Sequence, residues 1–113
     1  MTLGNYLRQT PKWTEVTVWD DIYDIEVYFD NMEDDIWSRA MMKFADKLEI
    51  IKFSGNGGVT VNMTEVIERN LNNPEFQDLF IDVSTDAIMC DMENILSGYV
   101  SEGWLVTFVN CLK

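Results

Sequence analysis

The chain has 113 residues and a formal net charge of −12 at pH 7, because 20 Asp and Glu stand against 8 Lys and Arg, with no histidine. Its 47% of hydrophobic residues suffices for a packed core, which excludes a disordered acidic chain and predicts a single domain over residues 1–113. A strongly negative surface repels nucleic acids and anionic membranes and attracts basic surfaces, although acidic residues also simply keep proteins soluble.

The first elements in chain order are a short helix and a strand hairpin. Leu3, Tyr6 and Leu7 share one side of a helix that Pro11 ends. Residues 15–19 and 25–29 alternate between apolar and polar side chains, which is typical of strands. The polar segment between them suits a tight reversal, so we predict a hairpin.

A helix with an acidic first turn is predicted next. Asn31 opens it, and Glu33, Asp34 and Asp35 occupy the first turn, where carboxylates complement the helix dipole. Apolar side chains then repeat at three-to-four spacing and form a buried stripe of Trp37, Ala40, Met41, Phe44 and Leu48.

Two more strands are predicted over residues 51–53 and 59–63, joined by a glycine-rich turn. Asn62 and Glu65 resemble the capping box of a helix that runs to about Asn70.

Three helices complete the chain. Pro74 suits the first position of a short one, and Ser84 or Thr85 starts a longer one that ends near Gly98. The inward side chains of the longer helix are predicted to be Ile88, Met92, Ile95, Leu96 and Tyr99. Ser101 caps the last helix. This order predicts an α+β fold, with a small antiparallel sheet of two hairpins packed on one face by several helices.

Acidic residues are segregated along the chain. The segment from Glu75 to Glu102 holds seven acidic residues and no basic one, while basic residues gather between Arg39 and Lys52. The first segment holds eight acidic residues and no basic one: Asp20, Asp21, Asp24, Glu26, Asp30, Glu33, Asp34 and Asp35. Clustered like charges repel one another, and a basic partner is a physical reason for keeping them together.

These eight residues, together with Tyr28, form the predicted partner-binding site. Trp19, Tyr23 and Tyr28 are expected on the outward side of the hairpin, and aromatic side chains beside carboxylates suit an interface. The alternative for Trp19 and Tyr28 is that they lie under a helix as ordinary core.

No motif predicts a cofactor, a metal or catalysis. Asp82, Ser84, Asp86 and Glu93 follow a calcium-loop spacing, but Ala87 stands where the loop requires glycine. Adjacent carboxylates point in different directions and do not converge on a substrate. The two cysteines, Cys90 and Cys111, sit among apolar residues, so we expect buried, reduced thiols.

Localisation is predicted from two absences. No apolar run approaches the roughly 18 residues of a membrane span, and residues 1–10 lack the apolar core of a secretory signal. We therefore expect a cytoplasmic protein without membrane contact.

Three segments carry a resemblance that covers nearly the whole chain. They are TEVTVWD running into DIEVY, GVTVN before a Glu-containing helix, and DMENILSGYVS. The chain resembles small acidic proteins carried on mobile elements and prophages of Gram-positive bacteria. Proteins of that origin include anti-CRISPR and anti-restriction inhibitors, some of which mimic DNA, so the resemblance implies a role inside a host bacterial cell.

The sequence thus predicts a non-enzymatic inhibitor that binds the basic nucleic-acid-binding surface of a bacterial defence nuclease, such as a CRISPR effector. Residues 75–102 would form a second epitope. One alternative is a regulatory or adaptor module that binds a protein through apolar surface, and a third is a divalent-metal protein. The last helix, with Trp104, Leu105, Phe108 and Val109, is predicted as core or as a homodimer contact.

Overall fold

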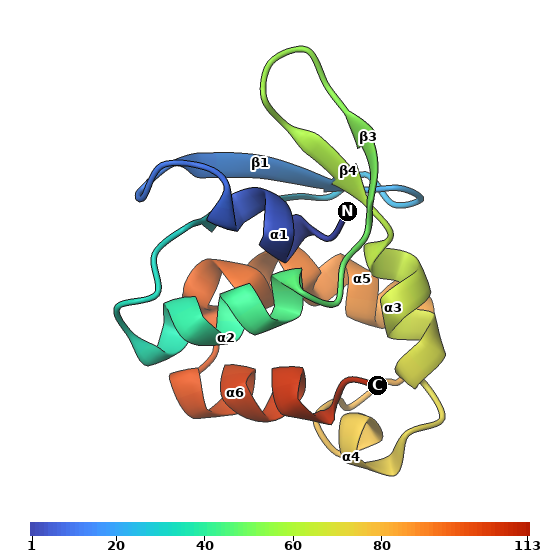
Figure 1. Cartoon of the computed structure of the whole chain (residues 1–113). Coiled ribbons are helices and arrows are strands. Elements are labelled where there is room, and N and C mark those ends of the chain that lie inside the picture. The colour runs from blue at the N-terminus through green and yellow to red at the C-terminus, as the bar shows by residue number, and fades with distance from the viewer.

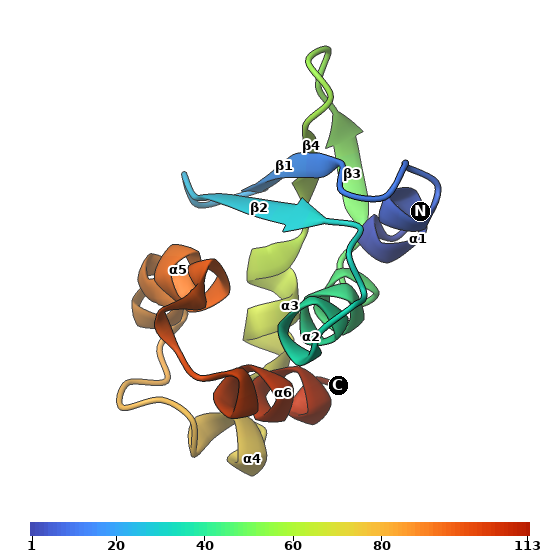
Figure 2. The ribbon, with the colours of Figure 1, turned by 90° about the vertical axis from the view of Figure 1, so that its left-hand side faces the viewer.

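Four strands form one sheet, with the N-terminal helix at its side and the other helices beneath it, in a computed structural model that describes residues 1–113 (Figures 1 and 2). The strands are β1 (Glu15–Asp20), β2 (Glu26–Asp30), β3 (Ile50–Phe53) and β4 (Val59–Val61). The helices are α1 (Leu3–Arg8), α2 (Ile36–Ala45), α3 (Met63–Asn70), α4 (Pro74–Gln77), α5 (Thr85–Asn94), the π-helical turn η1 (Ile95–Tyr99) and α6 (Glu102–Cys111). The predicted α+β fold is confirmed.

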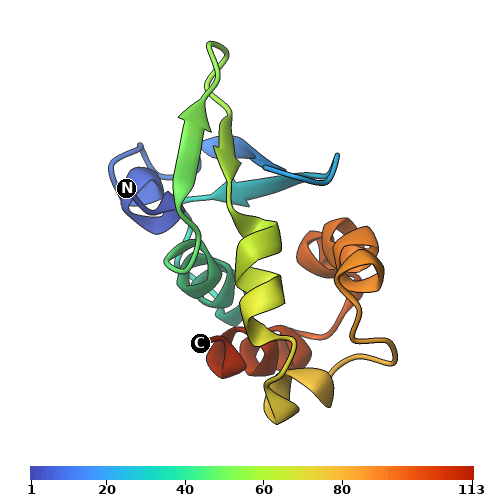
Figure 3. The same cartoon turned by 90° about the vertical axis from the view of Figure 1, so that its right-hand side faces the viewer.

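The sheet is mixed, which corrects the prediction of a purely antiparallel one. Both predicted hairpins are present, since β1 pairs antiparallel with β2 and β3 with β4. The hairpins join through β1 and β4, which run parallel, so the strand order is β2-β1-β4-β3. The join places Val18 beside Val59 and Asp20 beside Val61. The β3–β4 hairpin projects beyond the rest of the sheet (Figure 3).

One face of the sheet is buried, because apolar and polar side chains alternate along β1 and β2. Val16 and Val18 of β1 and Val27 and Phe29 of β2 point toward the helices, while the residues between them point outward. The helices form two levels below, with α2, α3 and α5 nearer the sheet and α4 and α6 farther from it (Figures 1 and 2).

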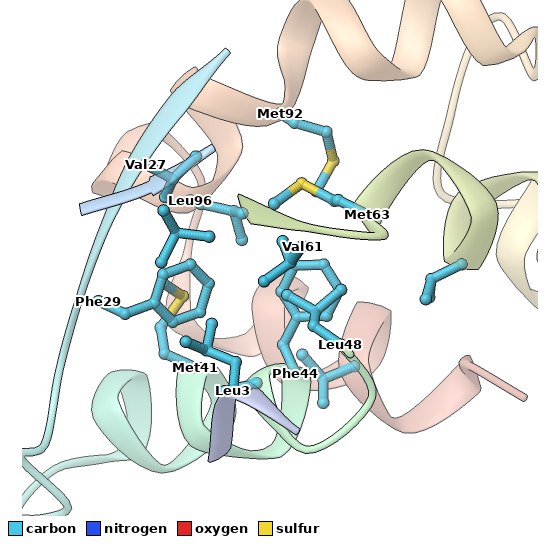
Figure 4. Packing of buried hydrophobic residues seen from close by; sticks show 14 of the residues in the cluster. Leu3, Val27, Phe29, Met41, Phe44, Leu48, Val61, Met63, Met92 and Leu96 are labelled. Atoms are coloured by element: carbon cyan, nitrogen blue, oxygen red, sulfur yellow. The ribbon is translucent and has the colours of Figure 1, made fainter. Parts of the chain in front are cut away.

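A single cluster of 29 buried hydrophobic residues forms the core. Phe44 of α2 lies at its centre, with ring centroids 6.4 Å from Phe29 of the sheet and 5.5 Å from Phe108 of α6. Met63 and Met92 meet between α3 and α5 (Figure 4). One continuous core is what a single domain requires.

Two element boundaries differ from the prediction. The helix predicted from Asn31 begins at Ile36, because the Asp35 side chain accepts a hydrogen bond from the Ser38 N–H and so caps the helix. Strand β4 ends at Val61, and Met63 already belongs to α3. None of the helices has both the length and the apolar character that a bilayer span needs.

The helix after Ser84 also ends differently. Gly98 has φ +94°, a left-handed conformation that stops the helix as predicted for a glycine at this place. The turn directs Tyr99 into solvent, where 80% of its surface is exposed, although the helical pattern predicts it inward. The last helix is core, since Leu105, Phe108 and Val109 are buried and Trp104 is half-buried.

Candidate partner-binding surface

The outward face of the β1–β2 hairpin carries carboxylates and aromatic rings in facing pairs. Glu15 lies opposite Asp30, and Trp19 lies opposite Glu26. Tyr28 stands between Glu26 and Asp30 on the same face of β2 and is 53% exposed. No helix covers this face (Figure 2), so these side chains lie on the side of the sheet that faces away from the helices.

The core alternative for Trp19 and Tyr28 is excluded. Tyr28 is exposed, and Trp19 is half-buried against Gly58 on the outward side of the sheet rather than against the core cluster. Gly58 matters here because a Cβ at this position would occupy the space of the Trp19 ring. Tyr23, which was also expected outward, is half-buried and contacts the core cluster at the end of the hairpin.

The two acidic segments of the sequence meet at the free edge of β2. The Glu26 backbone N–H, which has no strand partner on that side, donates to Glu93 Oε1 of α5 at 2.7 Å. Nearby, the Tyr23 hydroxyl donates to Asp86 Oδ1 of α5. Asp86 and Glu93 are seven residues apart and share one face of the helix. The second predicted epitope therefore joins the first at this edge.

Hydrogen bonds to carboxylates raise the pKa of both tyrosines. The bond to Asp86 raises the pKa of Tyr23 to about 12. The Tyr28 hydroxyl donates to Glu26 Oε1 at 2.9 Å, and this bond raises the pKa of Tyr28. Both phenols thus act as donors that orient carboxylates on the surface.

We define the acidic hairpin surface as five carboxylates from the hairpin and two from α5: Glu15, Asp21, Asp24, Glu26, Asp30, Asp86 and Glu93. All but the half-buried Asp30 are exposed, and none of the seven lies within 4.0 Å of a Lys, Arg or N-terminal nitrogen. Loss of hydration, and then the neighbouring Asp20 carboxylate, raise the pKa of Asp21. Unpaired carboxylates at this density favour a cationic partner.

Asp20 does not belong to this surface, which corrects its predicted role. It is only 7% exposed. Oδ2 accepts hydrogen bonds from the backbone N–H groups of Ile22 and Tyr23 at 2.8 and 2.7 Å, and both of its oxygens also accept from Thr64. A buried carboxylate with these partners holds the fold together and is not available to a partner.

The predicted residues Glu33, Asp34 and Asp35 are exposed but already engaged. Glu33 lies 3.7 Å from Arg8 and Asp34 lies 3.5 Å from Lys12. Asp35 caps α2. We therefore leave these three residues out of the acidic hairpin surface. Cations of the chain partly neutralise Glu33 and Asp34, and the Asp35 side chain already accepts the capping hydrogen bond of α2.

Three residues of the surface were not predicted as part of the hairpin epitope. Glu15 is on the outward face of β1, which the alternation over residues 15–19 already indicates. Asp86 and Glu93 could be assigned to one helix face from their spacing, but only the fold places that face beside β2.

Three of the basic residues without an ion pair lie on α2 or just past it, and Lys52 of β3 lies in the same cross-strand row as Trp19 and Glu26, at the opposite edge of the sheet. Arg39, Lys43 and Lys47 follow one another at four-residue spacing along α2 and just past its end, and all three are exposed. None of them takes part in an ion pair. Arg39 and Lys43 line a hollow between α2 and α6, whereas the hairpin carboxylates stand on the outward face of β1 and β2 or in the turn between them.

The cysteines and the calcium-loop pattern show no assembled chemical site. Cys111 is buried as predicted, but Cys90 is exposed, because it falls on the solvent side of α5. Ser84 caps α5 through the Ala87 N–H, and Asp82 accepts from the Ser84 N–H, so both oxygens serve the helix start. No three Asp, Glu or Cys side chains converge closely enough to hold a metal ion.

The resemblance to proteins of mobile elements stays a prediction. No family model, curated protein or solved structure matched this chain.

Proposed function

We propose that this protein is an inhibitor that binds the basic nucleic-acid-binding surface of a bacterial defence nuclease, such as a CRISPR effector. The acidic hairpin surface is the epitope. Its carboxylates occupy, on the target, the place of nucleic-acid phosphates, and the inhibitor thereby excludes the nucleic acid. The protein itself performs no chemistry in this scheme, and it acts in the cytoplasm of the bacterial cell.

The observation that carries the proposal is the meeting of two acidic segments at the β2 edge without a neutralising cation. Glu26 and Glu93 are far apart in the sequence, yet a 2.7 Å hydrogen bond holds them side by side. Keeping such charges together costs stability through repulsion. A basic target surface offsets this cost and gains from electrostatic steering of the encounter.

Rigidity supports the proposal as well. Five of the seven carboxylates stand on paired strands or on one helix, Asp21 and Asp24 lie in the short turn between the strands, and two of the seven accept hydrogen bonds from Tyr23 and Tyr28. Fixed charges lose little conformational entropy on binding. Tyr28 adds an exposed aromatic ring in the middle of the surface, which is the composition of an interface hot spot.

The test is a pull-down from a bacterial lysate, with the protein as bait and washes at low and then high salt. We expect capture of a nucleic-acid-processing protein that high salt releases, because screened charges attract weakly. The triple variant Asp21→Lys/Asp24→Lys/Asp30→Lys should lose this protein and keep its circular dichroism spectrum.

A control variant with the same net charge distinguishes loss of binding through the acidic hairpin surface from loss of binding through net charge alone. Glu49→Lys/Asp78→Lys/Glu102→Lys shifts the charge from −12 by three reversals of two units each, to −6, as the first variant does. These three residues are exposed and lie outside the acidic hairpin surface; Asp78 and Glu102 belong to residues 75–102 but not to α5, the part of that segment that meets the hairpin. The control should retain the captured protein. Equal loss in both variants, or partners that resist high salt, would instead favour the alternative of an adaptor that binds through apolar surface.

A further inference from the structure

An apolar groove lies on the other flank of α5. It has a volume of about 430 Å³ and is enclosed by α5, η1, the segment that joins α4 to α5, and Trp104 of α6. Leu79, Phe80, Ile95 and Val100 supply most of its apolar lining. This volume lies within the range of protein sites that bind small ligands or anchor side chains.

The two most exposed large apolar side chains of the protein flank this groove. Ile81 is 109% exposed and Tyr99 is 80% exposed, whereas the next such residue, Ile22, is 67% exposed. A single exposed apolar residue is ordinary. The two apolar side chains with the largest exposed fractions, placed beside one groove, indicate an interaction site.

Aromatic contacts tie one side of the groove to the core. The Phe80 and Trp104 rings meet edge to face with centroids 5.6 Å apart, and Trp104 stacks on the core residue Phe108 at 5.4 Å. Tyr99 takes its place because Gly98 adopts a left-handed conformation that other residues rarely adopt. A preformed apolar pocket holds an anchor side chain without ordering itself first.

The charge around the groove selects what enters it. Asp82 and Asp91 line it, and no basic residue occurs between Glu75 and Glu102. Helix α5 is shared by both sites, because Asp86 and Glu93 face the β2 edge while Ala87 and Asp91 face the groove. A basic protein bound at the acidic hairpin surface would therefore extend directly over α5 to the groove.

We propose that the groove receives an apolar anchor side chain, aromatic or large aliphatic, that a basic protein presents between lysines or arginines. That the partner is basic follows from the function proposed above, on which this inference rests. The anchor adds an apolar contact to an interaction that the carboxylates dominate, so the complex still dissociates at high salt.

The test uses three synthetic peptides as probes: Lys-Lys-Trp-Lys-Lys, the same peptide with serine in place of tryptophan, and Glu-Glu-Trp-Glu-Glu. Each is titrated into the ¹⁵N-labelled protein and followed by NMR. We expect the Lys–Trp peptide to move the amide signals of Ile81 and Tyr99 and the indole signal of Trp104. It should bind at this site about tenfold more tightly than the serine peptide.

Matched variants keep the proposal falsifiable. Ile81→Ser/Tyr99→Ser should remove the tenfold advantage without lowering the melting temperature, because both side chains are exposed. Trp13→Ser/Ile51→Ser, which also removes one aromatic ring and one isoleucine from exposed positions, should keep it.

The outcomes separate this proposal from the proposed function. If both basic peptides shift only the acidic hairpin surface, the anchor groove is wrong and the hairpin epitope stands. If the Lys–Trp peptide fills the groove while neither basic peptide shifts the hairpin, the groove stands and the epitope loses its support. Equal binding of the Glu–Trp peptide at the groove would overturn the proposal, because the basic flanks would then be irrelevant.

Discussion

The Asp20 carboxylate accepts two hydrogen bonds from Thr64, one from its backbone N–H at 2.7 Å and one from its hydroxyl at 2.6 Å. Thr64 stands in the first turn of α3, whose own N-cap residue, Asn62, makes no side-chain cap. The Asn62 side chain instead accepts from the Glu49 N–H and donates to Glu65. Asp20 thus caps α3 from a distant strand, and its charge complements the helix dipole.

The first prediction concerns this cap. Asp20→Ala should lower the free energy of unfolding by about 3 kcal/mol, because the buried donors of Thr64 and the part-buried N–H groups of Ile22 and Tyr23 lose their acceptor. Thr64→Val, which removes only the hydroxyl, should cost about 1 kcal/mol. Urea unfolding followed by circular dichroism measures both. Asp24→Ala is the control, since Asp24 is exposed, and equal stability of the Asp20 and Asp24 variants would disprove the structural role.

A second prediction concerns pH and Asp21. The pKa of Asp21 is raised in the folded protein above its ordinary value of 3.8, so the ionised carboxylate disfavours the folded state at neutral pH. Asp21→Asn should therefore raise the melting temperature at pH 7, and only slightly, because solvent screens an exposed carboxylate. The gain should disappear near pH 3, where the carboxyl is protonated in both states. Asp24→Asn controls for net charge, and an equal gain in that variant, or a gain that persists at pH 3, would contradict the prediction.

A third prediction tests the contact between Trp19 and Gly58. A Cβ at position 58 would lie 2.7 Å from Cη2 of Trp19 and nearer still to Cζ3. Gly58→Ala should therefore destabilise the fold by about 2 kcal/mol. In a Trp19→Ala background the same change should cost clearly less, because the ring is gone and only Ser54 Oγ, at 3.0 Å, remains close to the added Cβ. Gly55→Ala meets no atom within 4 Å and serves as the control. Equal costs of Gly58→Ala in both backgrounds would show that the ring does not rest on the glycine.

A fourth prediction separates the two thiols. Cys90 is exposed, whereas Cys111 is buried, its Sγ lies 3.0 Å from the Phe108 carbonyl oxygen, and burial raises its pKa. A thiol reagent such as DTNB attacks the thiolate, so the folded protein should release one equivalent quickly and the second only after unfolding. Cys90→Ser should abolish the fast phase. Two fast equivalents in the native protein would contradict the burial of Cys111.

Local order could be predicted from the sequence because its signals are short-range. Alternation over residues 15–19 and 25–29 predicts the hairpin, and Ser84 and Ser101 mark the starts of α5 and α6, which they cap. Three-to-four spacing predicts the stripe of α2. These patterns involve residues only a few positions apart, and their spacing matches the period of a strand or a helix.

The candidate site needed the tertiary structure. Asp20 and Asp21 are alike as sequence, yet the parallel pairing of β1 with β4 carries Asp20 to Thr64 and leaves Asp21 exposed. Likewise, only the packing of α5 beneath the sheet brings Glu93 to Glu26. The sequence determined the elements and the charge of each segment, because both are local properties. Which carboxylates are buried, and which converge on one surface, was decided by contacts between residues dozens of positions apart.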